Sequence, residues 1–593
     1  MIRFVITLFL SLLFSTSGFT QLYVSNNSYV YNKNSVVFAT GNIELNGANS
    51  NFYLRNQGQL LQGTTGASTN KGIGKLSVFQ EGTVNNFAYN YWCSPVGNAS
   101  AAAGNEDFGI TMLNIPTTKT ASTPATMITD DSDGQSSSGS LAISTYWIWK
   151  FLSSSTYAQW FQSGATTNIS AGQGFTMKGT AGSDATNVGE TAVNNPGSAQ
   201  RYDFRGKPND GNITVNIGTN NFTLTGNPYP SALHVNAFLL DAANSACTGI
   251  AYYWEQDKTV NSHLLLAYQG GYGTYSPVSL VSNGIYVPAT FNTYNIDGSL
   301  NTVGASSGLI IERKYAPIGQ GFMVKGNSNG ALTIKNSYRA YNKEGSFSQF
   351  EKNTNSATAN ETVIESVSQI RLNTIINNQY TTQIALAFVP QATDGVDRGI
   401  DAKSPVGEDV PNDVYFFLDN ERYVIQGVNF DIEKRIPIGI KVTNTTTFKF
   451  DASTVLNFDE SQTVYIYDAQ DNTYHDVKNG TYEVTLPSGI YNTRFELTFK
   501  NESLSTHPDI VSNFVIFQNN EAQQLTVSNP NLIAISSVKL FDLNGKLLFD
   551  NQKLEVKDSY KFTTNGLSEA VYLVQLLTKD NKKINQKIII SSK

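Results

Sequence analysis

Apolar and polar residues alternate with a period of two along much of the chain, in short stretches separated by Asn, Gly or Pro. Examples are "TQIALAFV" (382–389), "TYEVTL" (481–486) and "RFELTFK" (494–500). This period predicts β-strands with one buried face. Apolar spacing of the helical kind rarely persists beyond two turns, so the pattern predicts a mostly β protein. A length of 593 residues favours several domains.

Residues 21–89 are rich in Asn and Gly, with apolar bursts such as "SVVFATGNIEL" (35–45) and "NFYLRNQGQLLQG" (51–63). The bursts come at irregular intervals and end in Asn-Gly or Gly. This pattern predicts short strands and tight turns, with solenoid-like rungs as one possible arrangement.

The next region, 90–349, contains the same order of landmarks twice, in units of about 90–218 and 219–349. Each unit has a Pro-containing turn, then a Trp strand, then a glycine-rich phrase: "GQGFTMKG" at 172–179 and "GQGFMVKG" at 319–326. The phrase lacks the Gly-Lys-Ser/Thr ending and the following helix of a phosphate loop. We interpret it as one structural strand used twice, whose glycines permit a bulge or a close backbone approach.

Two polar segments without periodicity, 350–363 and 501–513, predict linkers. Between them, 364–500 contains at least seven alternating stretches, which predict a β-sandwich. The last module, 514–593, has Asn544-Gly545 between two apolar stretches, a strong hairpin signal.

Three stretches of this module carry a resemblance: "FDLNGK" (541–546), "LSEAVYLVQL" (567–576) and "KKINQKIII" (582–590). In order and position they resemble the C-terminal sorting domain of type IX secretion cargo in Bacteroidetes. Ala570 stands where that family usually has Gly. More loosely, the duplicated region resembles large flavobacterial surface proteins that carry such a domain.

The resemblance implies an immunoglobulin-like β-sandwich and a route across the outer membrane through the type IX translocon, followed by release or by attachment to the surface. It also implies candidate recognition positions, which are Asp542, Gly545, Lys546, Tyr572, Lys583 and Lys587. A structural interpretation stands beside it: Asn544-Gly545 makes a turn, and the lysines keep an edge strand soluble.

The first residues, "MIRFVITLFLSLLFSTSGFTQ", combine an early Arg, an apolar core and small residues. They predict a secretory signal peptide over 1–20 and hence a secreted or surface location. The rest of the chain has no apolar run long enough to span a bilayer. With a net charge of −7 and no basic stripe among aromatics, nucleic acid is not an expected partner.

The sequence shows no catalytic constellation. "GNSNG" (326–330) matches G-x-S-x-G around Ser328, but strand-like stretches flank it where the nucleophile elbow needs a strand and a helix. The four histidines are far apart in sequence, and no zinc spacing occurs. They are His234, His263, His475 and His507. We therefore predict that the protein is not an enzyme.

Two acidic loops are candidates for calcium, although neither has the complete ligand set of an EF-type loop. Acidic turns exposed to solvent are the favoured interpretation, and no other cofactor is expected. The candidate residues are Asp130, Asp131 and Asp133 in the first loop and Asp394, Asp397 and Asp401 in the second.

The stretch "YWIWKF" (146–151), read as a strand, places Trp147 and Trp149 on one face. Such a face could stack on sugar rings, although large aromatic side chains more often fill a core. Two cysteines, Cys93 and Cys247, would form one disulfide in an oxidising compartment or remain two buried thiols.

Together these observations predict a secreted cell-surface protein that is adhesin-like, structural or glycan-binding. Its expected partners are the type IX translocon, the attachment machinery and surface glycans. The alternative is a secreted hydrolase of polysaccharide or protein whose site is not visible in the sequence.

Overall fold

The computed structural model describes residues 21–137, 140–182, 200–309, 311–345, 348, 367–404, 410–457, 461–501, 514–580 and 582–591. The predicted signal peptide, the 350–363 linker and nearly all of the 501–513 linker lie outside these ranges. Strands make up 52% and helices 5% of the structure, so the prediction of a multidomain, mostly β fold is confirmed.

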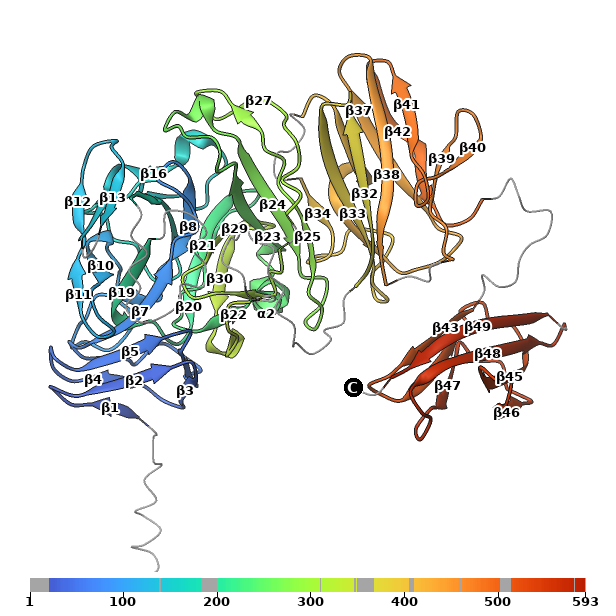
Figure 1. Cartoon of the computed structure of the whole chain (residues 1–593), viewed down its shortest axis with the longest axis horizontal. Coiled ribbons are helices and arrows are strands. Elements are labelled where there is room, and N and C mark those ends of the chain that lie inside the picture. The colour runs from blue at the N-terminus through green and yellow to red at the C-terminus, as the bar shows by residue number, and fades with distance from the viewer. Residues whose placement is uncertain are drawn as a thin grey trace, which may run out of the picture.

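The first six strands stack in parallel as two rungs (Figure 1). Each strand of the first rung pairs in register with its equivalent in the second: β1 with β4, β2 with β5, and β3 with β6. Asn34 and Asn56, at equivalent corners, have φ values of 58° and 47°, a left-handed conformation that Asn tolerates. The strands are β1 Leu22–Val24, β2 Tyr29–Lys33, β3 Val36–Ala39, β4 Ile43–Leu45, β5 Asn51–Arg55 and β6 Gln59–Gln62.

Strand β7 (Lys75–Glu81) continues the stack beside β5 and joins it to the first unit through an antiparallel pair with β19 (Arg201–Pro208). The rest of this unit consists of β9 Val96–Gly97, β10 Leu113–Pro116, β11 Ser122–Pro124, β12 Thr126–Ile128, β13 Gly134–Ser137, β14 Ser140–Ser144, β15 Trp149–Lys150, β16 Phe161–Gln162 and β18 Thr180–Ala181.

Both units pair the glycine-rich strand with the strand that precedes the Pro-containing turn. In the first unit β17 (Gly174–Lys178) pairs with β8 (Tyr89–Cys93), and in the second β29 (Gly321–Gly326) pairs with β21 (Phe222–Gly226). In both, a glycine of the phrase lies opposite the last residue of the partner strand.

The two glycine-rich strands lie where the units meet. A Cβ on Gly174 would stand 2.8 Å from the Thr225 carbonyl oxygen of the second unit. A Cβ on Gly321 would stand 2.7–2.9 Å from backbone atoms of Tyr91 and Trp92 in the first unit. Each unit therefore contributes one glycine on which a strand of the other unit packs.

The second unit is built on a five-stranded sheet in the order β21-β29-β23-β24-β25. Strand β20 (Ile213–Ile217), at the end of the first unit in sequence, pairs with β30 of the second. The other elements of the second unit are β22 Ala232–His234, α2 Val235–Leu240, β23 Cys247–Gln256, β24 Gly270–Ser276, β25 Ile285–Val287, β26 Thr293–Tyr294, β27 Leu300–Thr302, β28 Tyr315–Ala316, β30 Gly330–Ile334 and β31 Arg339–Ala340.

Residues 368–498 form one eleven-stranded sheet that curls around its own core. This body packs directly on the second unit: Ser276 Oγ donates to the Ile400 carbonyl at 2.7 Å, and Arg398 Nε donates to the Cys247 carbonyl at 2.9 Å. Its strands are β32 Ser368–Ile376, β33 Tyr380–Phe388, β34 Ala402–Lys403, β35 Asp413–Leu418, β36 Glu421–Val428, β37 Arg435–Val442, β38 Thr446–Leu456, β39 Tyr465–Asp468, β40 Thr473–Asp476, β41 Tyr482–Leu486 and β42 Gly489–Thr498.

The C-terminal module is a sandwich of a three-stranded and a four-stranded sheet with a separate core. Gly545 has a φ of 81°, and the Gly545 amide donates to the Asp542 carbonyl at 3.0 Å, so a tight turn forms where Asn544-Gly545 predicted it. The strands are β43 Val515–Asn519, β44 Gln524–Ser528, β45 Ile535–Asp542, β46 Leu547–Gln552, β47 Ser559–Thr563, β48 Ala570–Thr578 and β49 Lys583–Ile590.

Candidate binding pocket

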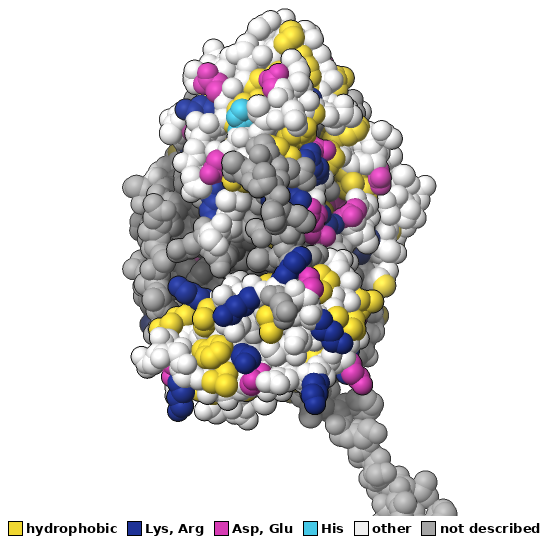
Figure 2. Space-filling view, turned by 90° about the vertical axis from the view of Figure 1, so that its right-hand side faces the viewer, with side chains coloured by type: hydrophobic (Ala, Val, Ile, Leu, Met, Phe, Trp, Pro, Cys, Tyr) yellow, Lys and Arg dark blue, Asp and Glu magenta, His cyan; other side chains and the backbone are white. Residues whose placement is uncertain are grey.

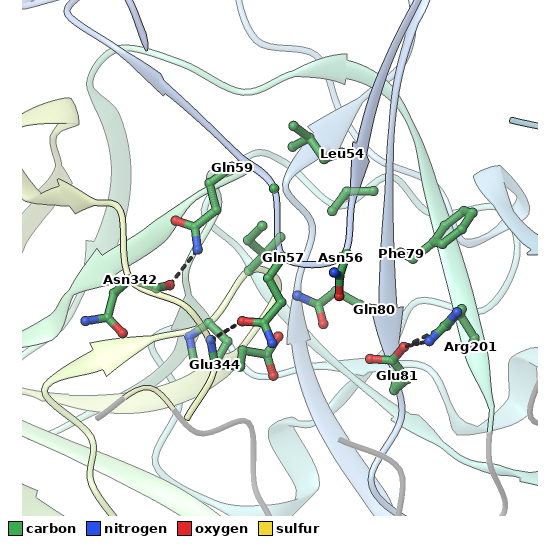
Figure 3. A pocket seen from close by; sticks show the side chains of 14 residues that line it. Leu54, Asn56, Gln57, Gln59, Phe79, Gln80, Glu81, Arg201, Asn342 and Glu344 are labelled. Atoms are coloured by element: carbon green, nitrogen blue, oxygen red, sulfur yellow. Dashed lines mark hydrogen bonds and ion pairs between the residues drawn. The ribbon is translucent and has the colours of Figure 1, made fainter. Parts of the chain in front are cut away.

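A polar pocket lies where the rung stack meets both units (Figure 3). It encloses about 520 Å³ of empty space, part of which is open to solvent. Its walls come from the corner between β5 and β6, from β7, from the start of β19, and from the segment after β31. Segments far apart in the sequence therefore build one concavity.

Carboxamide side chains dominate the polar part of the wall. Gln59 Nε2 donates to the Asn342 carbonyl at 2.5 Å, and the Glu344 amide donates to Gln57 Oε1 at 2.5 Å, as Figure 3 shows. These bonds hold the side-chain amides of Gln57 and Gln59 in place and connect the segment after β31 to the corner between β5 and β6. The carboxamides that line the pocket are Asn56, Gln57, Gln59, Gln80 and Asn342.

A buried ion pair forms another part of the wall. Arg201 Nε donates to Glu81 Oε1 at 2.6 Å, and Arg201 Nη2 lies 2.5 Å from the same oxygen. Both side chains are less than a tenth exposed. The Arg55 guanidinium lies 3.5 Å from the centre of the Phe79 ring, so one face of this aromatic residue is covered. The pocket therefore offers hydrogen bonds more than stacking.

A second pocket lies between β24 and β25 of the second unit and β33 of the eleven-stranded body. It contains about 600 Å³ of empty space, part of which is open to solvent, and its lining includes Asn292, Asn412 and Asp413. Burial raises the pKa of Asp413 to about 7, while Arg422 acts in the opposite direction. This pocket is also polar, but among the described residues fewer carboxamide side chains line it than line the first pocket.

Of the two interpretations of Trp147 and Trp149, a glycan platform or part of the core, the structure places Trp147 in the core. Residues Thr145–Trp147 make a 3₁₀ turn, so the strand alternation expected for this stretch is broken there. Trp147 is only 8% exposed and Trp149 is half-buried. The Trp147 ring stacks on His263, with centroids 4.9 Å apart. Trp147 is therefore part of the core and has no free face for a sugar.

The lysine of the first glycine-rich phrase contacts this tryptophan. Lys178 Nζ lies 3.6 Å from the centre of the Trp147 ring and 2.8 Å from His263 Nδ1. His263 Nε2 in turn lies 2.6 Å from Asp133 Oδ1. The rings of Tyr89 and Tyr268 complete the surroundings at 5.0 Å. Burial lowers the pKa of Lys178 to about 7, and the Asp133 carboxylate opposes this shift.

This amine gives a pH-dependent stability. Its folded pKa of about 7 is below the ordinary value, so at moderately alkaline pH the unfolded chain binds a proton that the folded chain does not. Relative to the Lys178→Met variant, the free energy of unfolding of the wild type should rise by about 2 kcal/mol between about pH 7 and pH 9. Urea denaturation at a series of pH values measures this difference.

The exposed Lys119 supplies the control, because Lys119→Met should leave the pH profile unchanged. If the profiles of wild type and Lys178→Met ran parallel, Lys178 would titrate alike in the folded and unfolded chains.

Most of the aspartates proposed as calcium ligands interact with other groups of the protein. Asp133 contacts His263, Asp394 pairs with Lys434, and Asp397 accepts from the Thr393 amide at 2.6 Å. Burial raises the pKa of Asp401 to about 7, and its carboxyl accepts from the Asp397 and Gly427 amides.

The first loop is similar: Asp130 accepts from the Ser132 amide at 3.2 Å, and Asp131 is exposed. Within the described ranges, no three His, Cys, Asp or Glu side chains gather closely enough to hold a metal ion.

Cys93 and Cys247 are both buried free thiols, so the structure has the second of the two predicted states. Burial raises the pKa of both thiols. Cys247 pairs across the sheet with Gly326, whereas Cys93 lies opposite Gly174, which places them in different sheets.

The histidines have structural partners or lie outside the described chain. His234 accepts from the Ala237 amide at the start of α2, and His475 stacks on Tyr482 with centroids 3.7 Å apart. His507 is outside the described ranges. Ser328 lies in the turn between β29 and β30, a strand–turn–strand setting that lacks the helix of a nucleophile elbow.

The candidate sorting residues divide into turn, core and surface positions. Asp542 Oδ1 accepts from the Asn544 and Lys546 amides, both at 2.9 Å, which fixes the Gly545 turn. Tyr572 is buried and donates to the Ser568 carbonyl at 2.6 Å. Lys583 and Lys587 are exposed on β49, the last strand of its sheet.

The sequence contained no motif for the pocket of Figure 3. Gln57 lies at a corner and Gln80 lies in a strand, and neither stands out in the sequence. Asn342 lies more than 250 positions away from both. The available signal was the density of Asn and Gln in the rung stack, which does not indicate which side chains converge.

These features define a multidomain β-protein with a polar pocket at the junction of its modules. The chain belongs to the family described as Domain of unknown function (DUF8693), whose family model matches residues 121–499. A second family model, Domain of unknown function (DUF8694), matches residues 504–590. No curated protein matches the chain.

Solved structures resemble the chain only weakly. Dimeric latent PorU from Porphyromonas gingivalis is 9% identical, with a TM-score of 0.13, over 38% of this chain and 30% of that one. A BSP domain of a biofilm associated protein is 10% identical, with a TM-score of 0.14, over 87% and 96% of the two chains.

The extracellular domain of BT4673, a one component system protein of B. thetaiotaomicron, is 11% identical, with a TM-score of 0.10, over 63% and 60%. This chain thus spans less than a third of the length of PorU, and none of these likenesses bears on its function. Among the described residues, no helix has the length and apolar character needed to cross a bilayer.

Proposed function

We propose that this protein is a secreted, non-catalytic cell-surface protein that is exported by the type IX system and binds neutral glycans in the carboxamide-lined pocket. The pocket is the observation that carries the binding role. Carboxamides donate and accept hydrogen bonds at once, as adjacent sugar hydroxyls do, and their neutrality suits an uncharged ligand.

Export is supported by features at both ends of the chain. The first 20 residues have the composition of a signal peptide. The C-terminal sandwich has its own core, and its β45–β46 hairpin contains the "FDLNGK" stretch that carries the resemblance. Its candidate recognition lysines, Lys546, Lys583 and Lys587, are exposed, and dark blue side chains are spread over the lower part of the face in Figure 2. Such a surface suits contact with an acidic receptor.

A specific observation favours polysaccharide hydrolysis as a second candidate. The pocket contains two carboxyl groups, those of Glu81 and Glu344, and most glycosidases use a pair. However, Arg201 donates to Glu81 in a buried ion pair, so this carboxyl group is already engaged by a side chain of the protein. Binding is therefore the preferred function.

A glycan array probed with residues 21–593 tests the binding role, followed by calorimetry with a retained glycan. Replacing both Gln57 and Gln80 by Ala should weaken binding at least about tenfold, because at least one net hydrogen bond is lost at each position. Asn412→Ala, in the second pocket, is the matched control and should bind as the wild type does.

Thermal melting of each variant shows whether the fold is intact. No retained glycan, or equal affinities for the pocket variant and the control, would contradict the assignment. Release of reducing ends from a bound polysaccharide would favour the hydrolase instead.

A further inference from the structure

The stack of parallel rungs has an open end at β1, β2 and β3. Each of these strands has a strand partner on one side, and β2 is the last strand of its sheet. In the described part of the chain, no strand pairs with their outer edges. The backbone donors and acceptors of these edges can therefore accept another chain.

The interior of the first rung is also incompletely covered. Leu22, Val30 and Val37 are only partly buried. Their register partners in the second rung are Ile43, Phe52 and Leu60, which are at most 1% exposed. The positions are equivalent, so the greater exposure of Leu22, Val30 and Val37 arises because no further rung of the described chain covers β1–β3 on their outer side.

The usual protection of a sheet edge is nearly absent here. Residues 21–40 contain no Pro and one charged residue, Lys33. Large apolar side chains are exposed instead: Tyr23 at 51%, Tyr29 at 64% and Phe38 at 59%. Natural edge strands normally carry charges, prolines or bulges that prevent association, so this edge has the character of an interface.

We propose that the open rung is the interface of a two-fold dimer, in which a second copy of this chain stacks its first rung on this one. A two-fold axis makes β2 antiparallel to β2 of the other copy. Pairing about the centre of the strand then sets Lys33 opposite Tyr29 of the other copy. The two lysines are kept apart, and each ammonium meets an aromatic ring.

The same arrangement covers the partly buried residues. Side chains alternate along β2, so Val30 points inward while Tyr29 and Lys33 share the outer face. The first rung of the other copy would cover Leu22, Val30 and Val37 in the way that the first rung of this chain covers Ile43, Phe52 and Leu60. An isologous contact of this kind closes on itself and does not propagate into a fibre.

Sedimentation velocity over a concentration series tests the dimer, with the chain from residue 21, the form left after the predicted signal cleavage. Phe38→Lys places two new charges in the interface and should raise the dimer dissociation constant at least about 100-fold. Ile296→Lys, at a residue 81% exposed in the second unit, is the matched control and should leave the constant unchanged.

A cysteine pair tests the register. In the Y29C/K33C variant, position 29 of each copy faces position 33 of the other at a Cα distance that a disulfide spans, so oxidation should yield a covalent dimer. Within one chain these positions are about 13 Å apart and cannot bridge. Y29C alone should not cross-link, because its two copies are offset in this register.

A chain that remains monomeric at about 100 µM, where even weak self-association shows, would overturn the proposal. So would a dimer that Phe38→Lys leaves intact or that Y29C/K33C does not cross-link, since the contact would then lie elsewhere.

Discussion

Removing residues 508–593 is expected to leave the rest of the chain in the periplasm. On the proposed route, the predicted signal peptide would direct passage across the inner membrane, and the C-terminal sandwich, which resembles a type IX sorting domain, would direct passage across the outer membrane. This sandwich has its own core, including Leu525, Val538 and Val574, so its removal should not disturb the cores of the other modules. Cell fractionation with protease treatment of intact cells measures the surface-exposed fraction.

Point variants separate recognition from folding. Lys583→Glu with Lys587→Glu reverses two charges on the exposed edge of β49 and should strongly reduce the surface-exposed fraction. Lys553→Glu with Lys561→Glu changes the same number of exposed lysines elsewhere in the module and is the matched control. A truncated chain that still reaches the surface would show that this module is not the sorting signal.

Gly321→Ala and Gly174→Ala are each expected to lower the free energy of unfolding by about 1–3 kcal/mol. In both cases the new Cβ would stand less than 3.0 Å from backbone atoms of the other unit, which cannot rotate away as a flexible side chain could. The strands must separate locally to admit the methyl group. Urea denaturation measures the loss.

Gly66→Ala is the control, because a Cβ there meets nothing within 4 Å. It should leave stability unchanged or raise it slightly through a less flexible unfolded chain. If all three variants unfolded alike, the glycines of the repeated phrase would not be needed for the contact between units.

Local features were predictable where they depend on neighbours in sequence. Period-two alternation placed the strands of the eleven-stranded body, and Asn544-Gly545 placed a turn because glycine accepts a positive φ. The continuous strand expected over "YWIWKF" is interrupted by a 3₁₀ turn that ends at Trp147, and the ring lies in the core beside Lys178 and His263, the place that large aromatic side chains more often take. Alternation assumes continuous extended backbone, and the pattern of residue types does not show where that backbone bends.

The repeated phrase "GQGF" illustrates the division between sequence and tertiary structure. Its duplication and its strand character follow from order and periodicity, which are properties of adjacent residues. Its role as a contact between the units depends on backbones that approach within a distance only glycine allows. The same holds for the pocket: the amides of Gln57 and Gln80 converge with Asn342 only after the modules have packed. Hydrophobic patterning specifies which residues are buried, whereas the convergence of distant surfaces depends on how whole modules meet.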